Sequence, residues 1–408
     1  MTYIRIRKKK LYVENISTHA LIKKYRTPFY CYSLAQLKNN FYSFKKAFEN
    51  INPIICFSVK SNANLNILKE LKKLGSGADV VSIGELLKAT KAGIKGDKIV
   101  FSGIGKTEEE IRAAIKKRVL LINIESENEA NLINKISGKL SKITSVGIRL
   151  NPNITGKTHK KISTGGKDEK FGLVYNDCIN LCKKIKKMKN IKLNGLSVHI
   201  GSQITNIEPF KKVLSIINKL CRKTKINFNF IDLGGGMGIS YTNKEKQLDL
   251  KQYAKLVNKF ISKNTKIIFE PGRFIIGNAA ILISKIIYIK KSINKNFVIL
   301  DAGMNDLMRP ALYDSRHQIV PLNKENKLIK GNFEFVGPIC ESSDKFLNQK
   351  NFFKIKEGDY VALTNVGAYG MSLSSNYNTR PTIAEIIVNG SAHKIIKKRQ
   401  SLENLVNS

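Results

Sequence analysis

Lys60 stands at the end of an apolar, β-favouring run, residues 54–59, after which the chain turns polar. A run of this length and composition predicts a buried strand. A lysine at the end of such a strand lies at the rim of the core, where burial lowers the pKa of the ammonium and leaves a nucleophilic amine. This is the chemistry that a Schiff-base lysine needs. The alternative is a lysine that extends into solvent, in a chain with 71 Lys and Arg residues.

Side chains that can take part in catalysis also stand at the ends of several other predicted strands, as Lys60 does. They are Asp79, Arg149, His199, Asp232, Glu270 and Arg273. In a barrel of parallel strands, catalytic residues lie at the carboxyl ends of the strands, so we expect these side chains to gather at one face. Ordinary turn residues do not explain so many of them at equivalent positions.

Small residues beside these strand ends suit a phosphate and a flat ring. Gly234–Gly238 holds four glycines, whose backbone N–H groups can approach an anion closely. His199 precedes Gly201 and Ser202, so its ring can stack on an aromatic cofactor while Ser202 binds a phosphate. A flexible turn and a hydrogen-bonded core histidine are the alternatives for these two features.

Glu270 ends another apolar run and is followed by Pro271 and Gly272, which force a turn. A carboxylate there can pair with a pyridinium nitrogen and keep it protonated, which makes the ring an electron sink. The alternative is an ion pair with Arg273, whose guanidinium can also bind a phosphate or a carboxylate through two hydrogen bonds. A nucleophilic lysine, a glycine-rich phosphate site, a stacking histidine and a ring-nitrogen carboxylate together predict a site for pyridoxal 5'-phosphate.

Short apolar strands alternate with amphipathic helices over about 250 residues, which predicts a parallel sheet. The number of units favours a closed TIM (β/α)8 barrel over a doubly wound open sheet. The predicted strands span residues 29–32, 54–59, 78–81, 98–102, 120–124, 145–150, 195–200, 229–233 and 266–270.

The rhythm changes after about residue 280, where β-like runs follow one another with few helical periods between them. We therefore predict an α/β protein of two domains. The barrel takes residues 26–280, and a β-rich domain of barrel or sandwich type takes residues 281–408 together with the N-terminal strands of residues 1–25. The polar, Gly/Lys/Thr-rich segment of residues 151–170 is expected to be a mobile loop.

Composition limits the classes of function. The formal charge of +40 suggests a nucleic-acid partner, but the lysines are spread along the chain without interleaved aromatic residues, so we expect no nucleic acid and no membrane partner. The six cysteines form no CxxC pair, and we predict no metal site. No secretory signal and no apolar stretch long enough to cross a bilayer stand out, which predicts a cytoplasmic protein.

Several motifs resemble those of the barrel-type pyridoxal-dependent amino-acid decarboxylases and alanine racemases. Within that superfamily the chain is most similar to the diaminopimelate decarboxylase family, from about residue 25 to residue 390. The motifs are Phe57–Asn62, His199–Ile204, Asp232–Gly236, Glu270–Arg273, Gly337–Asp344, Ala368–Met371 and Ser375–Pro381. Phe57 and Ser61 depart from the family, which usually has tyrosine and alanine there.

The resemblance implies a role for each matching residue. Lys60 binds the cofactor covalently, His199 stacks on its ring, and Glu270 contacts the pyridine nitrogen. The implied cofactor-binding residues are Lys60, Asp79, His199, Ser202, Gly235, Gly236, Glu270, Gly272, Arg273 and Tyr369.

The resemblance also implies a substrate site and an assembly. Cys340 acts with Lys60 as a catalytic residue, as the proton donor, and Glu341 reads the distal amino group. These two residues reach the active site of a second subunit, so a homodimer with shared active sites is expected. The implied substrate-binding residues are Arg273, Arg309, Tyr313, Glu341 and Tyr369.

The expected reaction is therefore the decarboxylation of meso-2,6-diaminoheptanedioate to L-lysine and CO2, the last step of lysine biosynthesis. Another decarboxylase of the superfamily, acting on ornithine, arginine or carboxynorspermidine, is the nearest alternative. Arg309 and Tyr313 argue against ornithine and arginine, because only a substrate with a distal carboxylate needs a cationic partner there. A pyridoxal-phosphate carrier without catalytic activity is a more distant alternative, and an RNA- or membrane-binding protein is a third.

Overall fold

The computed structural model describes residues 3–156, 164–166, 169–242, 245, 247–323 and 327–407. It divides into two compact units. Unit 1 comprises Met1–Asn40, Ser240–Glu245 and Ile275–Ser408, and unit 2 comprises Phe41–Ile239 and Lys246–Phe274. Much of the predicted mobile loop, namely residues 157–163 and 167–168, lies outside the described residues.

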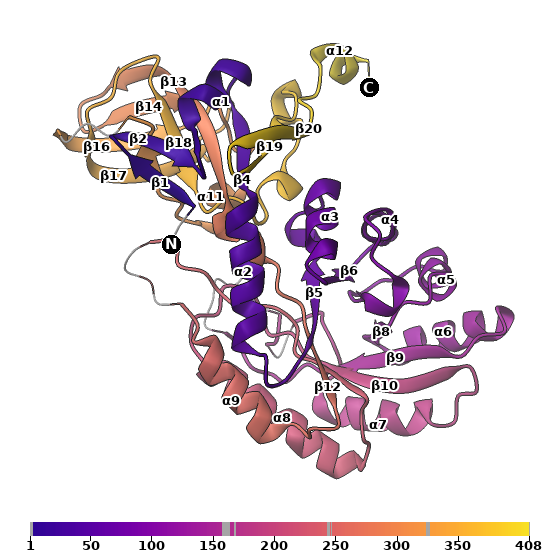
Figure 1. Ribbon diagram of the computed structural model, residues 1–408. Helices are drawn as coiled ribbons and strands as arrows, with labels where there is room; N and C mark the ends of the chain where they lie inside the picture. The colour runs from indigo at the N-terminus through magenta and orange to yellow at the C-terminus, as the bar shows by residue number, and fades with distance from the viewer. Residues whose placement is uncertain are drawn as a thin grey trace. The chain divides into compact units, whose positions relative to one another are not determined.

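Unit 2 is a closed barrel of eight parallel strands, which confirms the predicted fold class (Figure 1). Each strand pairs with its neighbour in sequence, and the last strand, β12, pairs with the first, β5. The strands are β5 (Ile54–Ser58), β6 (Gly77–Val80), β7 (Ile99–Phe101), β8 (Leu121–Ile124), β9 (Thr144–Arg149), β10 (Ile191–Ser197), β11 (Phe230–Asp232) and β12 (Lys266–Phe269).

Amphipathic helices connect these strands, as the alternating pattern predicted. Several begin at a side-chain cap, such as Ser82, Ser126 and Asp249, which accepts a hydrogen bond from a backbone N–H of the first turn. The helices are α3 (Leu65–Lys73), α4 (Ile83–Lys91), α5 (Glu108–Lys116), α6 (Glu127–Lys139), α7 (Tyr175–Ile185), α8 (Glu208–Thr224) and α9 (Leu250–Phe260), and α2 (Leu34–Ala47) and α10 (Arg273–Ile276) cross the boundary between the units.

An aromatic cluster packs beside the last barrel strand. Phe269 of β12 contacts Phe48, which follows α2, at 4.4 Å between ring centroids. Tyr253 of α9 lies 5.7 Å from Phe269 and 4.5 Å from Phe210 of α8. Because aromatic side chains bury large apolar areas, this cluster fixes α8 and α9 against the strand that ends at Glu270.

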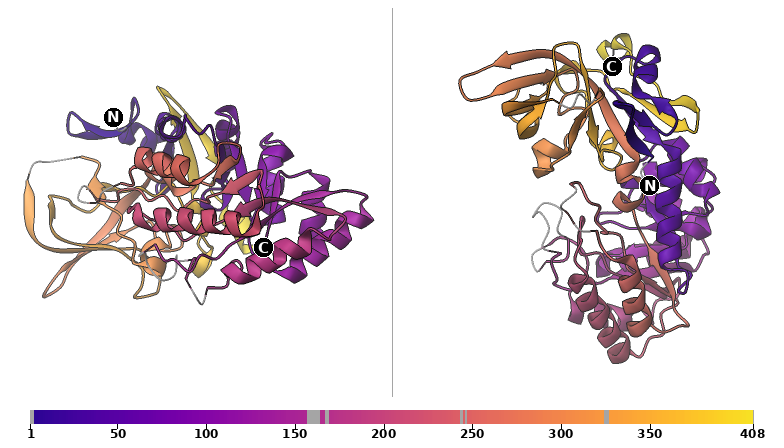
Figure 2. Two further views of the ribbon diagram at one scale, coloured as in Figure 1. Left: turned by 90° about the horizontal axis from the view of Figure 1, so that it is seen from below. Right: turned by 60° about the vertical axis from the view of Figure 1, so that its left-hand side comes forward.

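Unit 1 is built around a nine-stranded sheet whose longest strand, β13 (Ala280–Lys291), pairs with three neighbours. Figure 2 shows the hairpin of β13 and β14 extending to the edge of the unit. The other strands of the sheet are β4 (Phe29–Ser33), β14 (Asn296–Leu300), β15 (Ile319–Pro321), β16 (Leu328–Val336), β17 (Lys345–Phe353), β18 (Tyr360–Thr364), β19 (Ala384–Asn389) and β20 (Ala392–Lys397).

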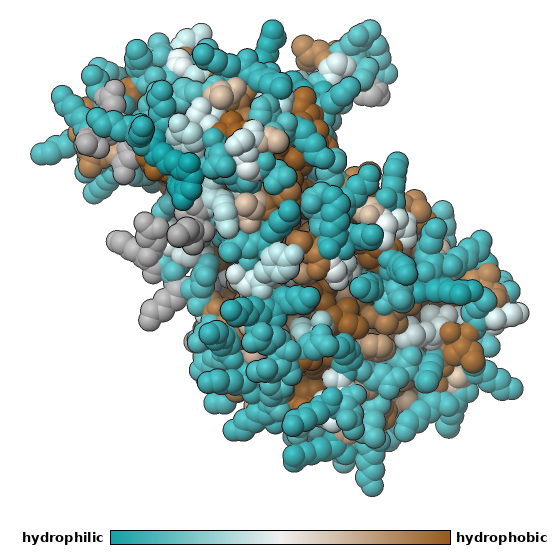
Figure 3. Space-filling view, in the orientation of Figure 1, coloured by the Kyte–Doolittle hydropathy of each residue, from teal (hydrophilic) through white to brown (hydrophobic). Residues whose placement is uncertain are grey.

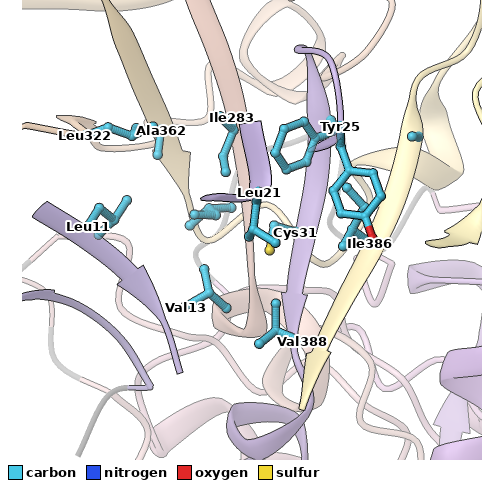
Figure 4. Close-up of a cluster of buried hydrophobic side chains, with 13 residues drawn as sticks. Leu11, Val13, Leu21, Tyr25, Cys31, Ile283, Leu322, Ala362, Ile386 and Val388 are labelled. Carbon is cyan, nitrogen blue, oxygen red and sulfur yellow. The ribbon is translucent and has the colours of Figure 1, made fainter. Parts of the chain in front are cut away.

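The N-terminal strands β1 (Ile4–Arg7), β2 (Lys10–Val13) and β3 (Ile16–Ser17) form a small antiparallel sheet of their own. Their apolar side chains, with those of α1 (Thr18–Lys24), pack into the core of unit 1 (Figure 4). Leu11 and Val13, for example, share a cluster with Ile283 of β13. The prediction that these strands join the β-rich domain is therefore confirmed.

One predicted strand lies elsewhere than the pattern placed it. The predicted barrel range, residues 26–280, includes β4, whereas β4 lies in the sheet of unit 1, where it pairs with β13 and β19. The eight other predicted strands already close the barrel. All five residues of β4 are buried, and a strand buried on both faces has the same apolar pattern in a barrel as in a sheet core.

Hydrophilic residues cover most of the visible face in Figure 3, without one dominant patch. This distribution agrees with lysines that are dispersed along the whole sequence. Among the described residues, no helix is both long and apolar enough to cross a membrane.

Candidate active site

Lys60 is held in place by a buried carboxylate. The strand β5 ends at Ser58, one residue earlier than predicted, and Lys60 lies in the following 3-10 turn, η1 (Val59–Ser61). Its Nζ is 2.8 Å from Oδ2 of Asp79, and the Asp79 side chain is fully buried while that of Lys60 is 37% exposed. The lysine nitrogen is thus fixed and still accessible.

Asp79 is itself positioned by its neighbours on the barrel. Oγ of Ser58 lies 2.8 Å from the same Oδ2 and 2.9 Å from the carbonyl oxygen of Glu270. The other oxygen, Oδ1, is buried and has no hydrogen-bond partner among the described residues. A buried oxygen without a donor is costly, so this position is suited to a donor that arrives with a ligand.

Lys60, His199 and Glu270 line one cavity of about 310 Å³ in unit 2. This volume lies at the lower end of the range of about 300–1,000 Å³ that is typical of small-molecule sites. The other described residues that line this cavity are Val81, Ser102, Gly103, Ile104, Arg149, Thr164, Phe171 and Ser197.

Glu270 is buried in the barrel together with a second carboxyl group, that of Asp232. Burial, followed by the negative charges of Asp232 and Asp79, raises the pKa of Glu270 well above its usual range, and only the Lys60 ammonium opposes the shift. Burial also raises the pKa of Asp232, which is hydrogen-bonded to Glu270. In one buried site each carboxyl group makes ionisation of the other less favourable, which is why the pKa values of both are raised.

A chain of uncharged polar side chains supports this carboxyl pair. Nδ2 of Asn123 is 3.0 Å from both Oδ2 of Asp232 and Oγ of Ser102, and Ser102 in turn lies 3.4 Å from Oε1 of Glu270. Ser197 lies 3.3 Å from Asp232. The sequence analysis did not single out Ser102, Asn123 or Ser197, although all three lie in or directly after barrel strands.

His199 is half-buried on the wall of this cavity. Burial, with the positive charges of Arg149 and Lys60, lowers its pKa well below the usual value. Its Nδ1 accepts a hydrogen bond from the backbone N–H of Gly235 at 3.3 Å, so the ring proton resides on Nε2. A neutral imidazole fixed in this way can pack flat on an aromatic ring.

The glycine turn after β11 leaves no room for side chains. A Cβ at Gly235 would lie 2.3 Å from the carbonyl oxygen of Glu270, and one at Gly236 would lie 2.4 Å from that of Gly201. Gly236 also has a φ of +92°, a conformation that favours glycine. The sequence is therefore restricted to glycine here by close backbone contacts.

Arg273 and Ser202 lie together beside this turn. Arg273 donates to Oγ of Ser202 from Nε at 3.3 Å and from Nη2 at 3.0 Å, and its side chain is buried. Gly272 packs against Ser61, whose Oγ would be 2.8 Å from a Cβ at that position. A hydroxyl and a guanidinium in contact form a donor set that suits a phosphate.

Arg149, at the end of β9, was noted in the sequence but assigned no role. Its Nη1 forms a buried ion pair with Glu125 at 2.9 Å, and its guanidinium carbon lies 4.8 Å from the centre of the Phe171 ring. Arg149 therefore connects the cavity wall to the segment after the loop. This connection depends on residues distant in the sequence, so no local signal identified it.

The other predicted site residues belong to unit 1. Arg309 and Tyr313 are the first and last residues of the short helix α11 (Arg309–Tyr313). Cys340 and Glu341 lie in the exposed turn between β16 and β17, where Glu341 accepts a hydrogen bond from the Tyr377 hydroxyl. Tyr369 follows β18 with a φ of +57°.

Comparison with known proteins agrees with this geometry. The family model of the pyridoxal-dependent decarboxylases, pyridoxal binding domain, matches residues 34–277. A diaminopimelate decarboxylase from Haemophilus influenzae is 40% identical over 99% of this chain and 98% of its own length. The chain belongs to the diaminopimelate decarboxylase family.

Solved structures of diaminopimelate decarboxylases have the same fold as this chain. The diaminopimelate decarboxylase from Helicobacter pylori, complexed with L-lysine, is 40% identical, has a TM-score of 0.91 and covers 96% of this chain and 98% of its own. The diaminopimelate decarboxylase from M. jannaschii, also in complex with L-lysine, is 33% identical, with a TM-score of 0.92, and covers 100% of this chain and 98% of its own.

The predicted cofactor, pyridoxal 5'-phosphate, is confirmed by the family, and the residues present fit it. Lys60 would provide the amine, Glu270 a partner for the ring nitrogen, and His199 a flat ring to stack on the cofactor. The glycine turn that a Cβ would fill, together with Ser202 and Arg273, would provide the donors for a phosphate.

Proposed function

We propose that this protein decarboxylates meso-2,6-diaminoheptanedioate to L-lysine and CO2, in the last step of lysine biosynthesis. The observation that supports it most is the barrel cavity lined by Lys60 and Glu270, in a chain about 40% identical to diaminopimelate decarboxylases over nearly its full length. When bound, pyridoxal phosphate supplies the electron sink that accepts the electron pair left by the departing carboxylate.

The residues of unit 2 prepare this chemistry. Asp79 holds the Lys60 nitrogen in place, and this amine would bind the cofactor covalently. Glu270, whose pKa is raised by burial and by the charge of Asp232, would pair with the ring nitrogen and keep it protonated. Neutral His199 adds no positive charge beside the ring, and Ser202 with Arg273 binds the anionic end.

The residues of unit 1 complete the substrate site in this proposal. Arg309 and Tyr313 bind the distal carboxylate, Tyr369 contacts cofactor and substrate, and Glu341 reads the distal amino group. The substrate loses CO2 and gains one proton on its α carbon, which Cys340 delivers. In the described structure the Cys340 side chain is exposed, as a donor to another subunit must be.

We further propose a homodimer in which each subunit supplies Cys340 and Glu341 to the active site of the other. Complementation tests this arrangement, because Lys60→Ala and Cys340→Ala subunits each lack one part of the site. Mixing the two inactive proteins under subunit exchange should restore up to about a quarter of the activity if sites are shared. The cytoplasmic location and the absence of a nucleic-acid partner remain predictions from the sequence.

The central test is a product assay with the purified protein and added pyridoxal phosphate. We expect one CO2 and one L-lysine for each meso-2,6-diaminoheptanedioate consumed, and little turnover of ornithine, arginine or carboxynorspermidine measured side by side. No CO2 from meso-2,6-diaminoheptanedioate, or faster release from one of the other compounds, would reject the proposed substrate. A protein that binds the cofactor but releases no CO2 from any of them would be a carrier.

A further inference from the structure

We propose that His317 is a positioning residue, which orients the Arg309 guanidinium for the distal carboxylate of the substrate; this rests on the substrate role proposed for Arg309. Arg309 is only 3% exposed, and His317 is fully buried beside it. Nη1 of Arg309 lies 2.8 Å from Nε2 of His317. A long side chain that binds a ligand loses less conformational entropy when it is held in advance.

The contacts of His317 define its proton position. Its Nδ1 lies 2.8 Å from the carbonyl oxygen of Thr364, and a carbonyl can only accept a hydrogen bond. A guanidinium can only donate, so Nε2 must accept from Arg309. The imidazole therefore carries its proton on Nδ1 and is neutral in this arrangement.

The surroundings make this imidazole a rigid support. Thr364 ends β18, and both its backbone N–H and its hydroxyl donate to the carbonyl of Gln318, at 2.9 and 3.3 Å. The Tyr241 ring meets the imidazole edge-on at 5.3 Å between centroids, and the Arg309 guanidinium carbon lies 5.0 Å from the centre of the same ring. Ser315 accepts a further hydrogen bond from Nη2 of Arg309 at 3.1 Å.

A neutral acceptor suits this task better than a carboxylate would. A carboxylate in the position of His317 would orient the guanidinium but would also cancel part of its charge. The histidine nitrogen orients Arg309 without adding negative charge, so the attraction for a substrate carboxylate is retained.

Protonation of His317 would abolish this support. The imidazolium carries N–H groups on both nitrogens, so Nε2–H would face the N–H of Arg309, and two positive charges would meet. The titratable groups that pack against His317 include Arg309 of α11 and Tyr241 of the 240–245 segment, and β18 contributes a carbonyl. Substrate binding should therefore weaken when the pH falls far enough to protonate His317.

Two substitutions separate support from simple packing. In His317→Gln the amide oxygen and nitrogen can reproduce the acceptor and the donor, whereas His317→Leu fills the space and provides neither. We expect KM for meso-2,6-diaminoheptanedioate to rise by about tenfold or more in the Leu variant, the effect of a lost hydrogen bond to a charged group, with kcat within threefold. The Gln variant should recover KM to within threefold and lose the acid-side rise of KM that the unaltered enzyme shows.

Inhibition supplies a second readout. L-Lysine keeps the distal carboxylate, and 1,5-diaminopentane lacks it, so His317→Leu should weaken inhibition by L-lysine only. Equal effects on both inhibitors, an unchanged KM in the Leu variant, or a Gln variant with the unaltered pH profile would overturn the role of His317.

Arg309→Leu distinguishes this inference from the proposed function. If Arg309→Leu leaves KM unchanged, the substrate role of Arg309 fails, and the inference fails with it. If Arg309→Leu raises KM strongly while His317→Leu does not, only the positioning role is rejected.

Discussion

The barrel unit and the β-rich unit place their candidate functional side chains by different means. In unit 2, Lys60, Asp79, His199 and Glu270 all occur at or just after the ends of parallel strands, and the closed barrel brings those ends to one face. In unit 1, Arg309 lies on a helix of one turn and a half, and Cys340 lies in an exposed turn. No repeated element of unit 1 gathers its residues.

In unit 1, individual buried contacts position these side chains. Asp344 accepts hydrogen bonds from the backbone N–H groups of Ile339 and Met304, both at 2.7 Å, and so shapes the turn that carries Cys340. His317 supports Arg309 in a similar way. The difference teaches that the site in unit 2 depends on a regular architecture, whereas that in unit 1 depends on single side chains. The following substitutions test this difference.

Lys60→Ala should have the largest effect. Without the nucleophile we expect activity to fall by at least about 10³-fold, and absorbance near the visible edge, recorded with added pyridoxal phosphate, should disappear. Lys73→Ala, which removes an exposed lysine of α3 that pairs with Glu70, is the matched control and should keep both the activity and the absorbance. A Lys60→Ala protein with the absorbance band intact would show that another lysine binds the cofactor.

Glu270→Gln should follow, with a fall in kcat of about 10²-fold, because an amide cannot hold the proton at the ring nitrogen. Asp232→Asn should cost about tenfold, since it keeps the shape and one acceptor but removes the charge that raises the pKa of Glu270. Steady-state kinetics of the two variants shows which substitution lowers kcat more. Equal losses would mean that the two carboxyl groups act as one unit.

Asp344→Asn should destabilise unit 1 by about 1–3 kcal/mol, because the amide group cannot accept both backbone hydrogen bonds. Urea unfolding of the variant measures this loss. Glu403→Gln, an exposed residue of α12 (Leu402–Val406), is the control and should change stability by less than about 0.5 kcal/mol. An Asp344→Asn protein as stable as the control would contradict the idea that single contacts shape this turn.

The smallest effect concerns pH. Burial raises the pKa of Asp306 in unit 1 to about 7, and burial with the charge of Asp79 raises that of Glu85 in unit 2 to about 7. A carboxyl group whose pKa is raised on folding favours the folded state below its unfolded pKa of about 4, and this contribution is lost as the pH rises to about 7.

Each group should therefore lower the free energy of unfolding by at most about 1.4 kcal/mol per pH unit in that window. Asp306→Asn and Glu85→Gln should each flatten the pH dependence of the free energy of unfolding, measured with urea between about pH 5 and 7, which lies within this window. If either variant has the same pH dependence of unfolding as the unaltered protein, the substituted group does not contribute to that dependence.

The sequence by itself determined the barrel and most of the candidate residues at its rim. Apolar runs of β-favouring residues recur at regular intervals, and the residues that follow each run are known from the chain, so Lys60, His199 and Glu270 could be proposed as candidates without coordinates. The glycines of the turn were equally visible, although the reason for them, the carbonyl oxygens of Glu270 and Gly201, was not.

Only the tertiary structure decided which side chains meet. Asp232 faces Glu270, Asn123 joins Asp232 to Ser102, and β4 pairs in unit 1 instead of the barrel. Likewise, His317 accepts a hydrogen bond from Arg309 and donates one to the carbonyl of Thr364, 47 residues farther along the chain. Local pattern fixes the type and end of each strand, but burial, pKa and hydrogen-bond partners depend on register and packing between distant segments.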